Sequence, residues 1–237
     1  LAEFERLNDR GGVLGAMDHN LKRQQNRLRF FESGRTYNGT LDNIVQEQHI
    51  AGAICGSAAP QQWGVETRAV DFYDLKGDVE ALLKRTGQDD FVFVPSSREI
   101  LHPGQSADIQ LRSGETVGYL GKLHPSVVKA LDLNRDVFVF EVNFDLLSRS
   151  ETPKFKELSR FPVSKRDLAL VVPNEMLTQQ IIDVMNGVTA PRKYLTNVTL
   201  FDIYAPKAEK SEDAAKNMAF SLTFQNREES LKDEDVD

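Results

Sequence analysis

The stretch "LHPGQSADIQLRSGETVGYLGKLHP", residues 101–125, decides the fold of the first half of this sequence. Its middle predicts a β-hairpin, because two apolar-rich segments, 107–111 and 116–123, flank the turn residues "RSGE". Pro125 then begins a short helix, since the first helical turn tolerates a residue that has no N–H group. A hairpin followed by a helix favours an antiparallel sheet with helices packed against it, and not a doubly wound parallel sheet.

The segment before the hairpin opens with a helix. We expect this helix over residues 13–21, because its apolar residues recur at helical spacing. They form one stripe: Val13, Leu14, Met17 and Leu21.

A second helix is expected between residues 71 and 87, with Asp74 as its N-cap and Gly87 as the residue that ends it. Strands are expected at 27–37, 50–56, 91–94 and 136–144, with a polar loop joining the first two.

A polar segment containing Pro153, residues 148–158, predicts a linker, so we expect domains at 1–150 and 151–237. In the second domain we expect, in order, a strand at 166–172 buried on both sides, a helix before Gly187, strands at 196–204 and 216–224, and a helix capped by Ser230. This βαββα order is one strand short of a ferredoxin-like unit. We therefore expect a fragment that is incomplete at its C-terminus.

Composition limits the class of protein. Hydrophobic residues make up 40% of the 237 residues, and the formal net charge is -7. This acidic balance gives no expectation of a strongly basic nucleic-acid-binding face, although a local RNA contact stays open. The single cysteine, Cys55, excludes an internal disulfide and fits a reducing, cytoplasmic compartment. No segment approaches the roughly 20 apolar residues of a membrane span, and we expect no membrane partner.

His102 and His124 each precede a proline in the two Leu-His-Pro triplets. A metal site would need a third ligand and groups that orient the imidazole rings. Both histidines stand at joints between expected elements, where a ring nitrogen can accept a hydrogen bond from the backbone. The expected role is structural, with ligand contact or metal binding as alternatives. The phosphate-binding, nucleophile-elbow, CxxC and HExxH motifs are absent from the sequence, which therefore offers no motif for catalysis or for metal binding.

Glu32 and Glu141 are carboxylates inside apolar strand-like segments. A buried charge needs a partner, and Arg29 and Arg35 are the nearby candidates. The two alternatives are a structural ion pair and a ligand pocket on the sheet.

The basic residues of the second domain do not by themselves indicate RNA binding. Residues 155–237 contain 11 Lys and Arg against 14 Asp and Glu, a net charge of 11 − 14 = −3. The cluster Arg160, Lys165 and Arg166 is therefore an RNA contact or an ordinary solvated face.

Several stretches together resemble one family. "LRFFESGRTY", "DFYDLKGDVEALL", "VGYLGKLHPSVVKALDL" and "FVFEVNFDLL" occur in the order found in the bacterial phenylalanyl-tRNA synthetase beta chain. "SRFPVSKRDLALVV" and "MAFSLTFQ" resemble the anticodon-binding module of that chain. The resemblance covers nearly the whole chain after residue 13, and it matches only the C-terminal part of the family.

The resemblance implies an α+β protein. Its first domain would be an antiparallel class II synthetase-like, pseudo-catalytic domain, and its second a ferredoxin-fold anticodon-binding domain. The expected partners are the alpha subunit, in a heterotetramer of two alpha and two beta chains, and tRNA(Phe). The holoenzyme would use ATP and Mg²⁺, with none bound by this fragment. The apolar stripe of helix 13–21 would contact the alpha subunit, and Phe161 would join the basic cluster in RNA binding.

Two features differ from a working class II site, in agreement with the degenerate catalytic-like domain of the family, and a third departs from the family's anticodon module. A working class II site needs an Arg-x-Glu strand pattern, whereas Arg29 and Glu32 are one residue too far apart and would point to opposite faces. "FVFEVNFDLL" lacks the expected glycine and arginine, and Glu229 stands where the anticodon module has arginine. We therefore expect a non-catalytic part of phenylalanine–tRNA ligase. The alternative is a free-standing RNA- or protein-interaction relative of the beta chain.

Overall fold

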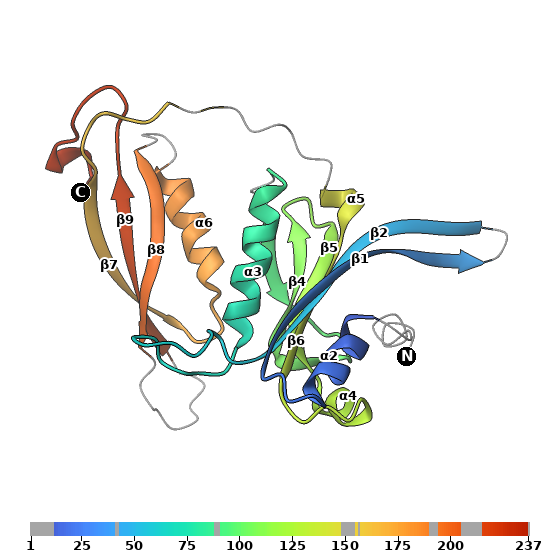
Figure 1. The fold of residues 1–237 in the computed structure, drawn as a ribbon. Coiled ribbons are helices and arrows are strands. Elements are labelled where there is room, and N and C mark those ends of the chain that lie inside the picture. Colours follow the sequence, from blue (N-terminus) through green and yellow to red (C-terminus); the bar gives the residue numbers. More distant parts are fainter. Residues whose placement is uncertain are drawn as a thin grey trace. The chain divides into compact units, whose positions relative to one another are not determined.

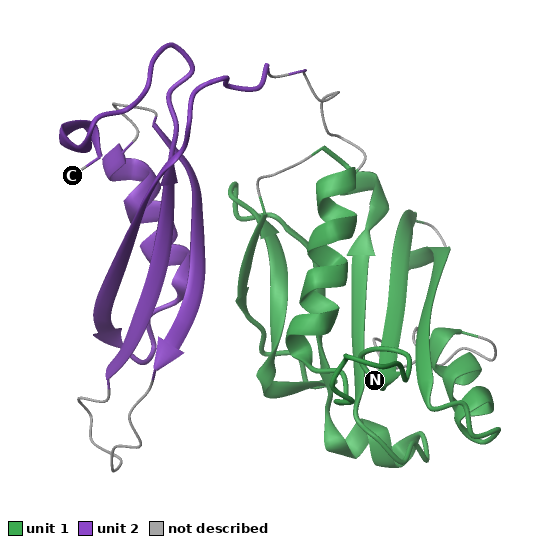
Figure 2. Ribbon diagram, turned by 60° about the vertical axis from the view of Figure 1, so that its left-hand side comes forward, with its two compact units in different colours: residues 1–153 green, residues 154–237 purple. Residues whose placement is uncertain are grey.

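The chain forms two compact units in the computed structural model, Leu1–Pro153 and Lys154–Asp237 (Figure 2). The structure describes residues 12–40, 43–87, 91–147, 155, 157–189, 194–204 and 215–236. The expected linker at 148–158 contains the boundary between the units, but most of it lies outside the described residues.

Unit 1 is built on a six-stranded sheet in the order β1-β2-β6-β5-β4-β3. Every neighbouring pair is antiparallel, as the hairpin at its centre predicts. The strands are β1 (Arg27–Thr40), β2 (Asn43–Gly56), β3 (Phe91–Pro95), β4 (Leu101–Leu111), β5 (Thr116–Leu123) and β6 (Val137–Asn143). The described part of unit 1 also contains the helices α2 (Val13–Leu21), α3 (Phe72–Arg85), α4 (Pro125–Ala130) and α5 (Phe144–Leu147).

The sheet of unit 1 is covered on both faces, with α2 and α4 on one side and α3 on the other (Figure 1). The central strand β6 is buried along its whole length, and its side chains alternate between two cores. Val137 and Val139 pack with α2, while Phe138 and Phe140 pack with α3. By this alternation Glu141 belongs to the α2 side.

The first hairpin is longer than the sequence predicts. In place of the expected polar loop, β1 and β2 pair in unbroken register from Arg27↔Gly56 to Thr40↔Asn43. Only the part of β2 from His49 to Cys55 also pairs with β6. The remainder is a two-stranded ribbon that projects beyond the sheet (Figure 1).

Local boundaries also differ from the expectation. The N-cap of α3 is Asp71 and not Asp74. The Asp71 side chain accepts from the backbone N–H groups of Tyr73 and Asp74, and the Asp74 side chain accepts from the N–H of Asp71. This reciprocal pair is a capping box, so the acidic residue at the third helical position completes the cap. Gly87 follows the helix with a positive φ of 77°, as expected for its end.

Unit 2 has a three-stranded antiparallel sheet in the order β7-β9-β8, covered on one face by a helix. Its elements are β7 (Ser164–Pro173), α6 (Thr178–Thr189), β8 (Leu195–Tyr204), β9 (Ala215–Phe224) and the 3₁₀ turn η1 (Asp233–Asp235). The side chains of β9 that face α6 are buried, as their alternation predicts: Met218, Phe220, Leu222 and Phe224.

Three expectations for unit 2 were wrong. Because α6 covers one face only, β7 is not buried on both sides, and Val171 is exposed. Helix α6 continues through Gly187 to Thr189, where the threonine hydroxyl donates a hydrogen bond to the Met185 carbonyl. The segment after Ser230 forms only the short turn η1, which Lys232 precedes.

Candidate functional site

Two of the buried polar side chains of unit 1, those of Glu141 and Asn143, lie on the α2 side of the sheet, where β2, β5 and β6 meet. Glu141 is 7% exposed. One of its carboxylate oxygens lies 2.7 Å from His49 Nδ1, and the other accepts a hydrogen bond of 2.8 Å from the Tyr119 hydroxyl. The Glu141 carboxylate thus has partners, which offset the free-energy cost of burying a charge in a low-dielectric interior.

A second carboxylate approaches the same histidine. Glu47 Oε2 lies 3.8 Å from His49 Nε2. Glu47 also accepts amide hydrogen bonds of 3.0 Å from Asn143 and 3.1 Å from Asn38. We call these six residues the Glu47–Glu141 cluster: Asn38, Glu47, His49, Tyr119, Glu141 and Asn143. The cluster joins strands β1, β2, β5 and β6.

Two cavities open onto the Glu47–Glu141 cluster, and Glu141 and His49 line both of them. The larger, about 340 Å³, also contains Arg98, whose guanidinium lies 4.4 Å from the centre of the Tyr119 ring and pairs with Asp108 at 2.9 Å. The smaller, about 130 Å³, includes Glu32. The ligand pocket expected on the sheet coincides in position with these two cavities, and its role as a ligand site stays a prediction.

The arginines expected to pair with the strand carboxylates do not pair with Glu141, whose partners are His49 and Tyr119. Arg29 instead forms an ion pair with Asp78 of α3, on the other face of the sheet. Glu32 is exposed and not buried. His49 was the histidine missed by the sequence reasoning, because its partner Glu141 is distant in the chain and only the pairing of β2 with β6 brings them together.

His102 and His124 each accept a hydrogen bond from the nearby backbone. His102 Nδ1 accepts from the Gly104 N–H at 3.1 Å. His124 is the N-cap of α4, where Nδ1 accepts from the Ser126 N–H at 3.3 Å. Within the described ranges, no three His, Cys, Asp or Glu side chains are arranged to hold a metal ion.

The apolar stripe of α2 lies inside unit 1. Val13, Leu14 and Met17 are buried in its core, and Leu21 packs against that core. Side chains already buried by their own sheet offer no surface to a second chain. A contact through α2 would therefore use the partly exposed Leu21 and the other side of this helix, and the interface role of these four residues stays a prediction.

The four residues expected to bind RNA do not share one surface. Lys165 pairs with Thr223 on the open face of the unit 2 sheet, whereas Arg166 pairs with Leu222 on the α6 side. The Arg166 guanidinium lies 2.6 Å from Asp233.

Arg160 and Phe161 precede β7. The Phe161 carbonyl accepts from the Gln225 amide at 2.7 Å, so the backbone here is tied to the end of β9. Arg160 is exposed.

The open face of the unit 2 sheet presents aromatic side chains that the sequence reasoning missed. Tyr204 is 64% exposed and pairs with Asn217, which faces away from the buried Met218. Phe201 is exposed at the irregularity between Leu200 and Asp202. The signal was the alternation of β9, which assigns to a face those residues of β7 and β8 that pair with it in register. Exposed aromatics on a sheet are groups on which RNA bases can stack.

The fold defines a class: an antiparallel α+β unit followed by a ferredoxin-like unit. Residues 6–144 match the family described as the phenylalanyl tRNA synthetase beta chain CLM domain. Residues 159–237 match the ferredoxin-fold anticodon binding domain. The chain therefore belongs to the phenylalanyl-tRNA synthetase beta chain family.

Similar curated proteins carry the name phenylalanine–tRNA ligase beta subunit. Those of Pseudomonas savastanoi pv. phaseolicola and Pseudomonas syringae pv. syringae are each 43% identical over 226 residues, which is 95% of this chain. That of Nitrosococcus oceani is 40% identical over 227 residues. The chain spans only 28% of the length of these relatives.

Among solved structures, a pyrrolysyl-tRNA synthetase of Desulfitobacterium hafniense aligns with a TM-score of 0.41 and 12% identity, over 55% of this chain and 43% of that one. This likeness is too low to support an argument. Among the described residues, no helix is long and apolar enough to cross a membrane.

Proposed function

We propose that this chain is a non-catalytic, C-terminal part of a phenylalanine–tRNA ligase beta subunit. In this proposal unit 1 contacts the catalytic alpha subunit, and unit 2 contacts the anticodon region of tRNA(Phe). The holoenzyme joins phenylalanine to its tRNA with ATP and Mg²⁺, in a complex of two alpha and two beta chains in the cytoplasm. The observation that carries the proposal is the match of both units, in order, to the two beta-chain domains.

The arrangement of β1 supports a non-catalytic unit 1. The Arg-x-Glu pattern with which a working class II site holds ATP places its arginine and its glutamate on the same face of the strand. Arg29 and Glu32 point to opposite faces, and Arg29 is engaged by Asp78. On the α2 face, the cavities are lined by more carboxylates than cations. Such a lining repels a polyphosphate.

The open face of unit 2 supports an RNA contact that relies on stacking and hydroxyl groups more than on charge. Next to Tyr204 this face presents Asn217, Val171 and Asp202, and farther along the sheet it presents Thr199, Asp167 and Lys165. Single-stranded RNA loops are recognised by stacking on aromatic side chains and by contacts to base edges. We assign the anticodon contact to this face.

The proposal is tested by size-exclusion chromatography of this chain with the matching alpha subunit, and separately with tRNA(Phe). Co-elution with alpha supports the assignment of unit 1, and retention of tRNA(Phe) over a non-cognate tRNA supports that of unit 2. If neither partner shifts the elution volume, the proposal is contradicted, and a free-standing relative of the beta chain becomes the better account.

A further inference from the structure

We propose that the Glu47–Glu141 cluster is a proton-dependent clamp, in which a protonated His49 holds the projecting part of the β1–β2 ribbon to the sheet. Along β2, pairing with β6 begins at His49, which lies opposite Asn143. Beyond it, residues 43–48 pair only with β1. A two-stranded ribbon is marginally stable alone in water. The direction in which the ribbon projects therefore depends on the contacts at the point where it joins the sheet.

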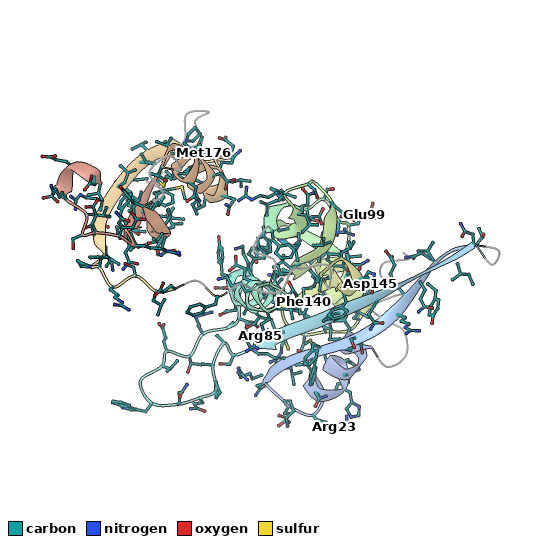
Figure 3. All side chains as sticks on the ribbon, turned by 90° about the horizontal axis from the view of Figure 1, so that it is seen from above. Arg23, Arg85, Glu99, Phe140, Asp145 and Met176 are labelled. Carbon is teal, nitrogen blue, oxygen red and sulfur yellow. The ribbon has the colours of Figure 1, made fainter. Side chains whose placement is uncertain are left out.

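The base of the ribbon is held from both faces of the sheet. On the α3 side, the Gln48 N–H donates a 2.9 Å hydrogen bond to Asp145. Figure 3 shows Asp145 beside the point where the ribbon leaves the sheet. On the α2 side, Asn38 of β1 and Asn143 of β6 both donate to Glu47, and His49 reaches across to Glu141. These side chains span three strands.

The geometry around His49 fits an imidazolium. Nδ1 and Nε2 face oxygens of Glu141 and Glu47, respectively, and an ionised carboxylate can only accept hydrogen bonds. A neutral imidazole has one N–H, so one of its two nitrogens would turn a lone pair toward a carboxylate. A protonated ring places one positive charge 2.7 Å from a Glu141 oxygen and 3.8 Å from a Glu47 oxygen, and this charge compensates two carboxylates that converge on the same histidine.

Other charged groups near His49 leave the balance negative. Glu32 and Arg35 of β1 line the smaller cavity, and Glu115 and Arg98 line the larger one. Arg98 is already paired with Asp108. Tyr119 of β5 donates to Glu141, and α2 contributes only the uncharged Val13 to the cavity lining. The surroundings therefore favour the cationic ring.

The sign of the pH dependence follows from this pairing. The contribution of His49 to the closed ribbon is present while the ring is protonated, and it is lost as rising pH removes that proton. Once the ring is neutral, the positive charge that faces the Glu47 and Glu141 carboxylates is gone. The ribbon then opens more often, while the central strands β5 and β6, which do not depend on His49 for their pairing, stay closed.

Two measurements on this 237-residue chain test the clamp. NMR of ¹⁵N-labelled histidine side chains reports whether His49 is protonated at each pH. Amide hydrogen exchange, expressed as protection factors, reports opening of the ribbon at residues 43–48, with the β5–β6 pair as internal reference. We expect His49 to be protonated at pH 7. We also expect ribbon protection to fall at least about tenfold, equivalent to one pKa unit, as the ring is deprotonated.

His49→Gln should lower ribbon protection at pH 7 and remove its pH dependence. The matched control is His19→Gln, because His19 is exposed on α2 and should leave the ribbon unchanged. If the His49→Gln variant does not fold, the pH dependence of ribbon protection in the unsubstituted chain is by itself the test of the clamp. A neutral His49 at pH 7 would overturn the clamp. So would ribbon protection that stays constant while His49 loses its proton.

Discussion

Arg29 and Glu32 of β1 face opposite sides of the sheet. Arg29 pairs with Ile54 and forms an ion pair with Asp78 on the α3 side. Glu32 pairs with Ala51 and lines the smaller cavity on the α2 side. Two side chains on opposite faces cannot contact one ligand. This relationship was expected from the spacing alone, and it is the geometric basis for proposing a non-catalytic unit 1.

Removing the Tyr119 hydroxyl tests the buried part of the Glu47–Glu141 cluster. Tyr119→Phe should lower the free energy of unfolding of unit 1 by about 1–3 kcal/mol, because the buried Glu141 carboxylate loses a donor. Urea denaturation at neutral pH measures the loss. Tyr37→Phe is the matched control, since Tyr37 is exposed on the ribbon and should change stability little. Equal effects of the two variants would contradict the role of this hydrogen bond.

Two glycine substitutions in unit 1 should act in opposite directions. A Cβ at Gly118 would come 2.9 Å from Val142 Cα, so Gly118→Ala forces the β5–β6 pair apart and should cost about 1–3 kcal/mol. Gly77 lies within α3 with open space around its Cα, so Gly77→Ala should stabilise the unit by up to about 1 kcal/mol. Thermal unfolding of both variants checks this. Stabilisation by Gly118→Ala would show that the packing of these strands is misassigned.

The capping carboxylate Asp74 should give unit 1 a stability component that depends on pH. The hydrogen bond from the Arg68 guanidinium lowers the pKa of Asp74 from 3.8 to about 2. The ionised carboxylate therefore stabilises the fold above about pH 4, and this contribution is lost as the pH falls toward 2. Asp74→Asn should thus destabilise unit 1 more at pH 6 than at pH 3 in urea denaturation. An equal loss at both pH values would rule out the charge as the cause.

The open face of unit 2 should carry the RNA contact. Tyr204→Ala should weaken binding of a tRNA(Phe) anticodon stem-loop by about 1–3 kcal/mol, the range for loss of one stacked base. Fluorescence anisotropy at fixed salt measures the affinity. The matched control is Val188→Ala, because Val188 is exposed on α6, away from the open face.

Arg166→Ala gives a second comparison for the RNA contact, since that guanidinium is paired with Asp233 on the α6 side. It should weaken binding less than Tyr204→Ala. If Arg166→Ala weakens RNA binding more than Tyr204→Ala does, the RNA contact lies on the α6 side of the sheet instead.

Apolar periodicity predicted most of the elements, because burial of one face of a helix or strand imposes it. The stripe of α2 and the alternation of β9 are examples. The projecting ribbon was not predicted, since its strands are polar and owe their order to pairing with each other. The 3₁₀ turn at the C-terminus was also missed, because the capping pattern after Ser230 does not by itself provide a packed face.

The candidate site was only partly predictable. Glu141 was identified because a carboxylate inside an apolar strand needs a partner. Its partner His49 could not be identified, since the register of β2 against β6 sets which residues meet. In unit 2, Lys165 and Arg166 were candidate RNA contacts because of their charge. They are neighbours in β7, so strand alternation places them on opposite faces of the sheet.

The most direct test of the central claim is phenylalanine-dependent exchange of pyrophosphate into ATP, measured for this chain alone, for the matching alpha subunit, and for their mixture. The account predicts no exchange by this chain alone and exchange in the mixture, in fractions where the two co-elute. Exchange by this chain alone, at a rate that follows its concentration, would contradict the proposal that unit 1 is a non-catalytic partner.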